Sequence, residues 1–335
     1  MNLLSNPLQW RVGLVGYGEV GRILAEDLRA KGVAVAMYDL KLESDAGAPM
    51  REHARAHGVN IALAHAPLAG QADLVISAVT ASQAVSAAQA CAERIAAGSF
   101  FLDFNSASPG AKIRAAGIVD GAGGRYVEGA VMTSVPPHRI RVPLLLGGPH
   151  AAALEPGLRA LGFDARRSSE KLGIASATKM CRSVMIKGLE AMVIESLTTA
   201  RAWGVEDQVL ASLQETFPGV RWEEQSSYFF QRVIEHGRRR AEEMREAAQT
   251  VREAGLDPWS AEGTAMRQAW VAGLAEHDLF RGEAGEGAAR RDWRIQADRI
   301  LASIRSSARS TAGLSAGSIA ESSAGSIAQS PGHRR

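Results

Sequence analysis

A glycine-rich turn between an apolar run and an amphipathic stretch constrains this chain more than any other feature. The turn, Gly16-Tyr17-Gly18-Glu19-Val20-Gly21, follows a predicted strand over Val12–Val15 and opens a predicted helix over Val20–Ala30. The G-x-G-x-x-G spacing is weak alone, but between a strand and a helix it is typical of dinucleotide-binding units. The first glycine would permit the tight turn, the second the approach of a pyrophosphate, and the third close helix–strand packing. We therefore predict that the six residues of the turn bind a dinucleotide at the positive end of the helix dipole.

Short apolar runs alternate with helical patterns through the first half of the chain. The predicted strands are Val12–Val15, Val33–Tyr38, Leu74–Val79, Phe100–Phe104, Val127–Val131 and Pro143–Leu146, and helical patterns include Val20–Ala30, Ala84–Ala97 and a helix starting at Ser108-Pro109. This alternation predicts a parallel sheet, and strands that are apolar throughout indicate that helices cover both of its faces. We therefore predict an α/β Rossmann-type doubly wound parallel sheet.

Strand signals almost vanish beyond about residue 170. The predicted helices there are Gly173–Trp203, Glu206–Thr216, Trp222–Ala254, Ser260–His277 and Asp292–Ile304. We expect a dinucleotide-binding domain over residues 8–170, an all-α domain over 171–305 and a disordered tail over 306–335. The tail is rich in Ser, Ala and Gly and has few large apolar groups to offset its ordering entropy. A tethering role for the tail is the less favoured alternative.

The charge of the chain is nearly balanced, with 38 Lys and Arg against 36 Asp and Glu. This balance gives no reason to expect nucleic acid as a partner. The single basic run, Arg238-Arg239-Arg240, is followed at helical spacing by Glu242, Glu243 and Glu246. Such spacing predicts a solvent-exposed helix face on which these arginines and glutamates form ion pairs.

Several classes of protein are disfavoured by what the sequence lacks. No apolar run approaches the ~18 residues of a transmembrane helix, and the first residues do not resemble a signal peptide. The two cysteines, Cys91 and Cys181, cannot form a disulfide framework, which argues for a reducing compartment. We therefore expect a cytoplasmic protein that binds no membrane, and we expect Cys181 to belong to the core.

Asp39 lies at the end of the second predicted strand, about 20 residues beyond the glycines. Its carboxylate would accept hydrogen bonds from a ribose 2′-hydroxyl and repel a 2′-phosphate, which favours NAD over NADP. Lys41 follows two residues later and could attract a phosphate, so NADP stays an alternative. A turn and a strand-end aspartate without any ligand form the less favoured interpretation.

Three motifs resemble those of the β-hydroxyacid dehydrogenases, the superfamily that includes 3-hydroxyisobutyrate and 6-phosphogluconate dehydrogenases. They are the glycine turn, the stretch Asp103-Phe104-Asn105-Ser106-Ala107-Ser108-Pro109, and the helix start Gly173-Ile174-Ala175-Ser176-Ala177-Thr178-Lys179. The resemblance covers roughly residues 10–205. The later helices are more similar to a subgroup labelled phosphogluconate-dehydrogenase-like, with an atypical helical domain.

The resemblance implies that Lys179 is the catalytic acid/base. Oxidation of an alcohol needs a group that takes the hydroxyl proton as hydride leaves for a nicotinamide. A lysine can do this if burial, nearby cations and the helix dipole lower its pKa. A solvated lysine near the end of a helix is the alternative.

Candidate substrate contacts follow Lys179 on the same helix face. Arg182 could bind a carboxylate with its fork of donors, and Ser183 stands where the family usually has Asn. The family's usual Ser-Gly-Gly loop is replaced by Met132-Thr133-Ser134, and the hydroxyls of Thr133 and Ser134 can still hydrogen-bond a substrate. We expect the family's chemistry to carry over, but not its substrates.

Polar residues that follow the predicted strands complete the candidate site. Asn105 and Ser106 come just past a strand, where ligands bind in open α/β sheets. We assign Asn105 to both cofactor and substrate, and Thr80 to the cofactor. A plain turn before Pro109 is the alternative for Asn105 and Ser106. His138 is expected to be exposed or structural rather than catalytic.

The residues and the resemblance together predict an NAD(P)-dependent oxidoreductase acting on the CH–OH group of a β-hydroxy acid, with decarboxylation left open. An imine reductase on the same scaffold and a non-catalytic NAD-binding regulatory module are the alternatives. The resemblance also implies a homodimer built through the helical domain. Since no His, Cys or Asp cluster has metal-ligand spacing, no metal is expected.

Overall fold

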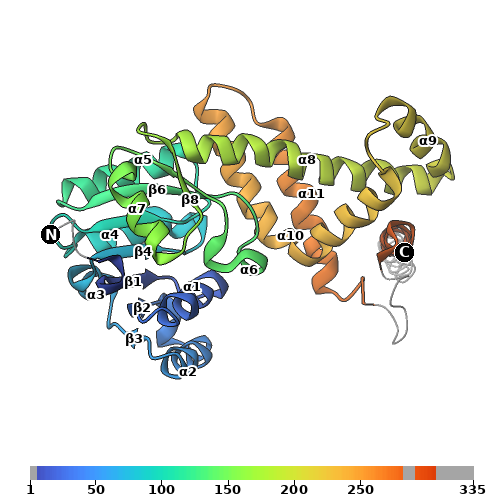
Figure 1. Cartoon of the computed structure of the whole chain (residues 1–335). Coiled ribbons are helices and arrows are strands. Elements are labelled where there is room, and N and C mark those ends of the chain that lie inside the picture. The colour runs from blue at the N-terminus through green and yellow to red at the C-terminus, as the bar shows by residue number, and fades with distance from the viewer. Residues whose placement is uncertain (1–5, 282–290, 307–335) are drawn as a thin grey trace, which may run out of the picture. The chain divides into compact units, whose positions relative to one another are not determined.

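The computed structural model describes residues 6–281 and 291–306, and we refer to these as the described residues. One eight-stranded sheet organises the first half of the chain (Figure 1). Its spatial order is β3-β2-β1-β4-β5-β6-β7-β8. The strands are β1 (Arg11–Val15), β2 (Ala34–Tyr38), β3 (Asn60–Ile61), β4 (Leu74–Ser77), β5 (Phe100–Asp103), β6 (Arg125–Val131), β7 (Leu144–Gly147) and β8 (Ala165–Ser169).

The six predicted strands are present, but the sheet is not parallel throughout. β7 runs antiparallel to β6. The connection between them begins and ends at the same end of the strands and does not cross back over a face of the sheet. Two strands were not predicted. β3 has only two residues, and β8 reads Ala-Arg-Arg-Ser-Ser, with three exposed positions in succession. Both are edge strands, which lack the apolar pattern on which strand prediction depends.

Helices cover both faces of the sheet, as predicted. One core cluster joins strand residues to α1 (Glu19–Arg29), α2 (Ala48–Ala56) and α7 (Ala151–Leu161). The other joins the opposite strand faces to α3 (His65–Gln71), α4 (Ala84–Ala92) and α5 (Pro109–Gly121). Ser108 caps α5 as expected, with its hydroxyl accepting from the N–H of Ala111 at 3.3 Å. The fold is therefore a doubly wound, mostly parallel α/β sheet.

The second half of the described chain is helical. The elements are α8 (Ile174–Trp203), α9 (Glu206–Thr216), α10 (Trp222–Glu253), α11 (Trp259–Glu276) and a last helical segment over residues 293–306. Each lies close to its predicted range. The predicted tail falls almost wholly outside the described residues.

Contacts divide the chain differently from the expected boundary near residue 170. Of the described residues, the first compact unit holds 6–187 and 242–265, and the second holds 188–241, 266–281 and 291–306. The beginning of α8 and the end of α10 thus belong to the unit that contains the sheet. There they pack through a small core of Met180, Met244, Ala247, Ala248, Ala261 and Ala265.

The second unit has its own core of aromatic and aliphatic side chains, including Leu197, Phe230, Val233, Trp293 and Ile300. A buried ion pair joins Arg240 to Glu190, whose carboxylate also accepts from the amide of Gln268. Arg240 is only 4% exposed, so the prediction of a wholly solvated arginine run is wrong at this residue. The arginine is buried because a carboxylate on α8 pairs with it.

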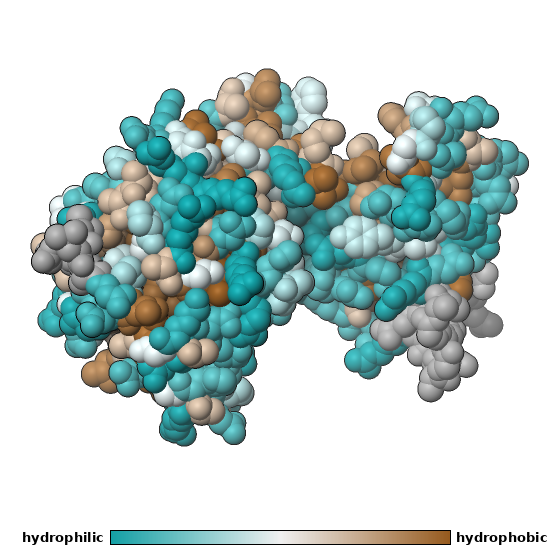
Figure 2. Space-filling model, in the orientation of Figure 1, coloured by the Kyte–Doolittle hydropathy of each residue, from teal (hydrophilic) through white to brown (hydrophobic). Residues whose placement is uncertain are grey.

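The surface of the described chain is largely hydrophilic on the face that Figure 2 shows, with separate hydrophobic patches. None of the described helices combines the length and apolar character that crossing a membrane requires.

An ion pair links the amino ends of two central strands. The Arg11 guanidinium donates to both carboxylate oxygens of Asp73, at 3.0 and 3.1 Å, and the Arg11 backbone N–H donates to the same carboxylate at 2.9 Å. Partial burial would raise the pKa of Asp73, but these bonds outweigh it and hold that pKa below its ordinary value of 3.8.

We expect Asp73→Asn to lower the free energy of unfolding by at most about 1 kcal/mol at pH 7, because the pair is partly exposed. A carboxylate with a lowered pKa stabilises the fold above its unfolded pKa, and that contribution is lost as the pH falls through the folded pKa. The difference between wild type and variant should therefore shrink below about pH 3.8. Urea unfolding at pH 7 and pH 3 measures it, with the exposed Glu215→Gln as control. If Asp73→Asn lowered the free energy of unfolding equally at both pH values, the pairing of Asp73 with Arg11 would be contradicted.

Candidate functional site

The carboxyl ends of β1, β4, β5 and β6 lie at one edge of the sheet, because these strands are parallel. The chain proceeds from β1 to β2 on one side and places β4 on the other. Ligands of open α/β sheets bind outside the carboxyl ends of strands at such a switch point. The loops after these four strands carry half of the predicted site residues.

The glycine turn after β1 has the geometry that its sequence predicts. Gly16 has a φ of +89°, and a Cβ there would lie 2.5 Å from the carbonyl oxygen of Ala78. A Cβ on Gly21 would lie 2.2 Å from the carbonyl oxygen of Gly16, so helix and turn pack closely. Gly18, in contrast, has no atom within 4 Å of its Cβ position, and no side chain caps α1. The turn thus leaves open space beside Gly18 at a helix start that no side chain caps.

Asp39 ties the end of β2 to the glycine turn. One carboxylate oxygen accepts the N–H of Tyr17 at 2.7 Å, and the other accepts the N–H of Lys41 at 2.9 Å. The Tyr17 side chain is fully buried, so this predicted cofactor contact belongs to the core. Glu19 and Val20 lie in the first turn of α1. Asp39 therefore shapes the turn through both oxygens of its half-buried carboxylate.

Asn105 links the loops after β4 and β5. Its side-chain oxygen accepts the N–H of Val79 at 2.7 Å, and its side-chain nitrogen donates to the Ser77 hydroxyl at 3.0 Å. The residue is 3% exposed. Its amide is thus engaged within the protein, and it holds the loop that carries Thr80, an exposed residue whose hydroxyl lies 3.2 Å from that of Ser82.

A fully buried ion pair between Lys112 and Asp103 holds the backbone of Asn105. Lys112 on α5 contacts the Asp103 carboxylate at 2.8 Å, and neither side chain is exposed. The other Asp103 oxygen accepts the Tyr126 hydroxyl at 2.7 Å, while the N–H of Asn105 donates to Asp103 at 3.0 Å. Burial, reinforced by Asp103, raises the pKa of Tyr126 well above its ordinary value, so the phenol stays protonated and donates.

Lys179 lies next to the loop after β5. It stands on the second turn of α8, half-buried, and its Nζ donates to the Ser106 hydroxyl at 2.6 Å. Contacts therefore run along the sheet edge from Asp39 through the glycine turn, the β4 loop and Asn105 to this lysine. The predicted motifs that are far apart in the sequence meet here.

The start of α8 is held by a residue that the sequence analysis missed. Glu128 on β6 is fully buried, and its carboxylate accepts the N–H of Gly173 at 2.7 Å and that of Ser176 at 2.5 Å. A carboxylate at this position satisfies orphan donors and complements the helix dipole. Glu128 thereby sets where α8 begins and which turn carries Lys179. An acidic residue inside an apolar strand was the available signal.

Two further carboxylates were also missed. On α10, Glu246 accepts the N–H of Ser108 at 2.8 Å, and Glu253 accepts the N–H of Gly110 at 2.8 Å and the Ser108 hydroxyl at 3.0 Å. They bind the end of α10 to the start of α5. Because more than a hundred residues separate these partners, spacing in the sequence offers no indication of the contact.

The other residues near Lys179 on α8 differ in environment. Arg182 is exposed, whereas Ser183 is buried with its hydroxyl 3.4 Å from Lys187, which pairs with Glu243 at 2.5 Å. Cys181 is exposed, so its expected core position is wrong. It faces away from the packed side of α8.

The loop after β6 places its hydroxyls at the same sheet edge. Thr133 is exposed and Ser134 half-buried, immediately before the short helix α6 (Val135–His138). His138 is exposed, which is one of the two environments expected for it.

Comparisons with known proteins identify the class. Residues 11–155 match the family described as the NAD binding domain of 6-phosphogluconate dehydrogenase, and residues 200–271 match one described as a domain of unknown function, DUF1932. The fold and these matches define a protein with an NAD-binding domain of the hydroxyacid dehydrogenase type, followed by a helical region.

Two solved structures assign the family. A conserved hypothetical protein from Sinorhizobium meliloti 1021 is 37% identical, with 77% of this chain and 87% of that chain covered and a TM-score of 0.67. The conserved protein MTH1747, described as of unknown function and structurally similar to 3-hydroxyacid dehydrogenases, is 30% identical, with 80% and 98% covered and a TM-score of 0.63. This chain belongs to the β-hydroxyacid dehydrogenase superfamily, as its motifs predicted.

A more distant match shows similarity of the fold only. The 3-hydroxyisobutyrate dehydrogenase of Mycobacterium tuberculosis is 16% identical, with 81% of this chain and 99% of that chain covered and a TM-score of 0.64.

Proposed function

We propose that the protein oxidises the CH–OH group of a β-hydroxy acid with NAD(P), or catalyses the reverse reduction, using Lys179 as general acid/base. The observation that carries this proposal is the bond from Lys179 Nζ to the Ser106 hydroxyl at the carboxyl edge of the sheet. This bond supports the proposal because the Lys179 amine lies at the edge of the sheet where ligands of open α/β sheets bind, and an amine there is able to transfer a proton.

The residues present fit a dinucleotide. The open space at Gly18 and the uncapped start of α1 suit a pyrophosphate, while Gly16 and Gly21 are packed too closely for any side chain. Asp39 would contact the ribose, and Thr80 lies on the loop beside the turn. A bound nicotinamide supplies the hydride acceptor for the reaction.

Lys179 would complete the proton transfer. In its amine form, its Nζ takes the proton of the substrate hydroxyl as the carbon gives up hydride, and a C=O group forms. In the reverse direction its ammonium returns that proton to the alkoxide oxygen. Ser106 orients the lysine through the 2.6 Å bond. If the keto acid loses CO₂, the same ammonium could protonate the enolate carbon.

The substrate carboxylate would be bound by exposed groups near this lysine. Arg182 offers a bidentate fork, and Thr133 and Ser134 offer hydroxyls after β6. Ser183 is buried beside Lys187, so we assign it to positioning within α8 rather than to direct contact.

Thermal unfolding with NADH, NADPH or neither tests the cofactor part of the proposal. A ligand at about 100 times its Kd adds about 2.7 kcal/mol to the stability of the folded state. We expect both to raise Tm, with the larger shift for NADH because Asp39 would repel a 2′-phosphate. A larger NADPH shift would overturn the role of Asp39, and no shift with either would overturn the proposal.

A substrate screen tests the reaction. β-Hydroxy acids with NAD or NADP should produce the reduced cofactor, which is followed by its absorbance. Turnover of cyclic imines but not of hydroxy acids would indicate an imine reductase instead, and cofactor binding without any turnover would indicate a regulatory module.

We further propose a cytoplasmic homodimer. The exposed apolar side chains of Met185, Ile186 and Met192 on α8 support a contact with a second chain. Neither nucleic acid nor a membrane is part of the proposed function.

A further inference from the structure

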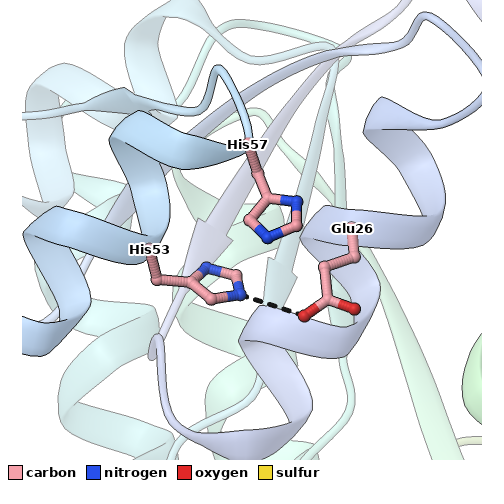
Figure 3. A group of neighbouring side chains, drawn as sticks. All are labelled: Glu26, His53 and His57. Atoms are coloured by element: carbon pink, nitrogen blue, oxygen red, sulfur yellow. Dashed lines mark hydrogen bonds and ion pairs between the residues drawn. The ribbon is translucent and has the colours of Figure 1, made fainter.

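Three metal-ligating side chains lie together on the NAD-binding domain, outside the candidate active site. Figure 3 shows Glu26 on α1, His53 on α2 and His57 at the end of α2 with their polar ends gathered. One ligand atom of each lies within 4.8 Å of those of the other two. His53 Nε2 is 2.9 Å from Glu26 Oε1, and the two imidazole rings stack with centroids 4.4 Å apart.

We propose that Glu26, His53 and His57 form a binding site for a divalent transition-metal ion of the Zn²⁺ class. Histidines four residues apart at the end of a helix present their rings on one side, and a carboxylate from the facing helix completes the set. Imidazole nitrogen and carboxylate oxygen are ordinary zinc ligands, and three protein ligands leave a fourth position for water. His57 is exposed and the other two are half-buried, so an ion can reach them.

The surroundings orient two of the ligands. The Tyr17 hydroxyl lies 3.1 Å from His53 Nδ1 and can accept its proton in a hydrogen bond. His53 Nε2 then becomes the metal ligand, and the ion replaces the direct bond between Nε2 and Glu26 Oε1. Arg139 donates to Glu26 Oε2 at 2.6 Å and leaves Oε1 facing the histidines. Partners of this kind are what the outer shell of a metal site provides.

The nearby cations are engaged elsewhere. Arg139 also donates to Asp27 at 2.8 Å, so it is shared between two carboxylates. Arg29 donates to the backbone carbonyls of Val33 at 2.8 Å and His57 at 3.2 Å. Because the two arginines bond to other atoms, the Glu26 Oε1 atom faces the imidazoles.

The ion would link α1, the helix that follows the glycine turn, to the end of α2. It would therefore stabilise the NAD-binding domain, and it would take no part in the proposed hydride transfer. The inference does not depend on the proposed activity.

Metal binding by the untagged, full-length protein tests the site. After treatment with a chelator and its removal, calorimetry with Zn²⁺ should give one ion per chain, and Zn²⁺ should raise Tm in the absence of nucleotide. Co²⁺ should produce the visible absorption bands of a four-coordinate site. No bound ion and no Tm shift at micromolar Zn²⁺ would overturn the proposal.

Variants locate the ion. His57→Gln changes an exposed side chain and should weaken Zn²⁺ binding by at least about tenfold, and Glu26→Gln should do the same. Tyr17→Phe should weaken it by about 10–100-fold, because the orienting hydroxyl is lost. The control is His277→Gln, an exposed histidine of the second unit, which should bind as wild type does. Unchanged binding by His57→Gln would place the ion elsewhere and overturn the assignment.

Discussion

Replacing Lys179 with alanine should lower turnover by about 10²–10⁴-fold, the usual contribution of a general acid/base. The effect follows from its position, because its Nζ contacts Ser106 beside the loops proposed to bind nicotinamide and substrate. The cofactor-induced rise in Tm should remain, since the glycine turn and Asp39 do not depend on this side chain. Steady-state rates with the best hydroxy acid, together with thermal shifts, measure both quantities.

Two further variants separate proton transfer from charge. Lys179→Arg keeps the positive charge but cannot act as a base, so its turnover should stay as low as that of the alanine variant. Lys171→Ala removes an exposed lysine shortly before α8 and should leave the rate unchanged. Normal turnover by Lys179→Ala would refute its role, even if the protein proved to be a dehydrogenase.

Replacing Lys112 with methionine should lower the free energy of unfolding by about 3–5 kcal/mol, the cost of leaving a buried charge without its partner. Asp103 would keep only the Tyr126 hydroxyl and the Asn105 N–H as donors, with no cation beside a carboxylate that has no exposure. Urea unfolding at pH 7 measures the loss. Because Asn105 depends on Asp103, turnover should fall as well.

The double variant Asp103→Asn/Lys112→Met tests the electrostatic cause. It removes the unpaired charge, so it should be more stable than Lys112→Met alone. Arg114→Met, an exposed position on the same helix, should change stability by no more than about 0.5 kcal/mol. A loss from Lys112→Met no larger than that of Arg114→Met would show that the buried pair contributes little.

Local patterns account for much of what was predicted correctly. The apolar strands, the capped start of α5 and the long helices α8 and α10 were found because burial and helix periodicity appear in neighbouring residues. The glycine turn was found because its spacing follows directly from the backbone geometry that Gly16 and Gly21 require. The family resemblance supplied Lys179, which spacing alone would not distinguish from a solvated lysine.

What local patterns could not predict depends on partners far apart in the chain. Glu128 at the start of α8, the pairing of Arg240 with Glu190, and Glu246 and Glu253 at the start of α5 all join distant segments. The His53–His57 pair became a candidate metal site only when Glu26, on another helix, came within reach. The sequence by itself therefore determined the type of fold, the dinucleotide turn and the family. The tertiary structure decided which polar side chains are buried, paired or brought together, because those outcomes depend on contacts between segments whose distance in space the sequence does not state.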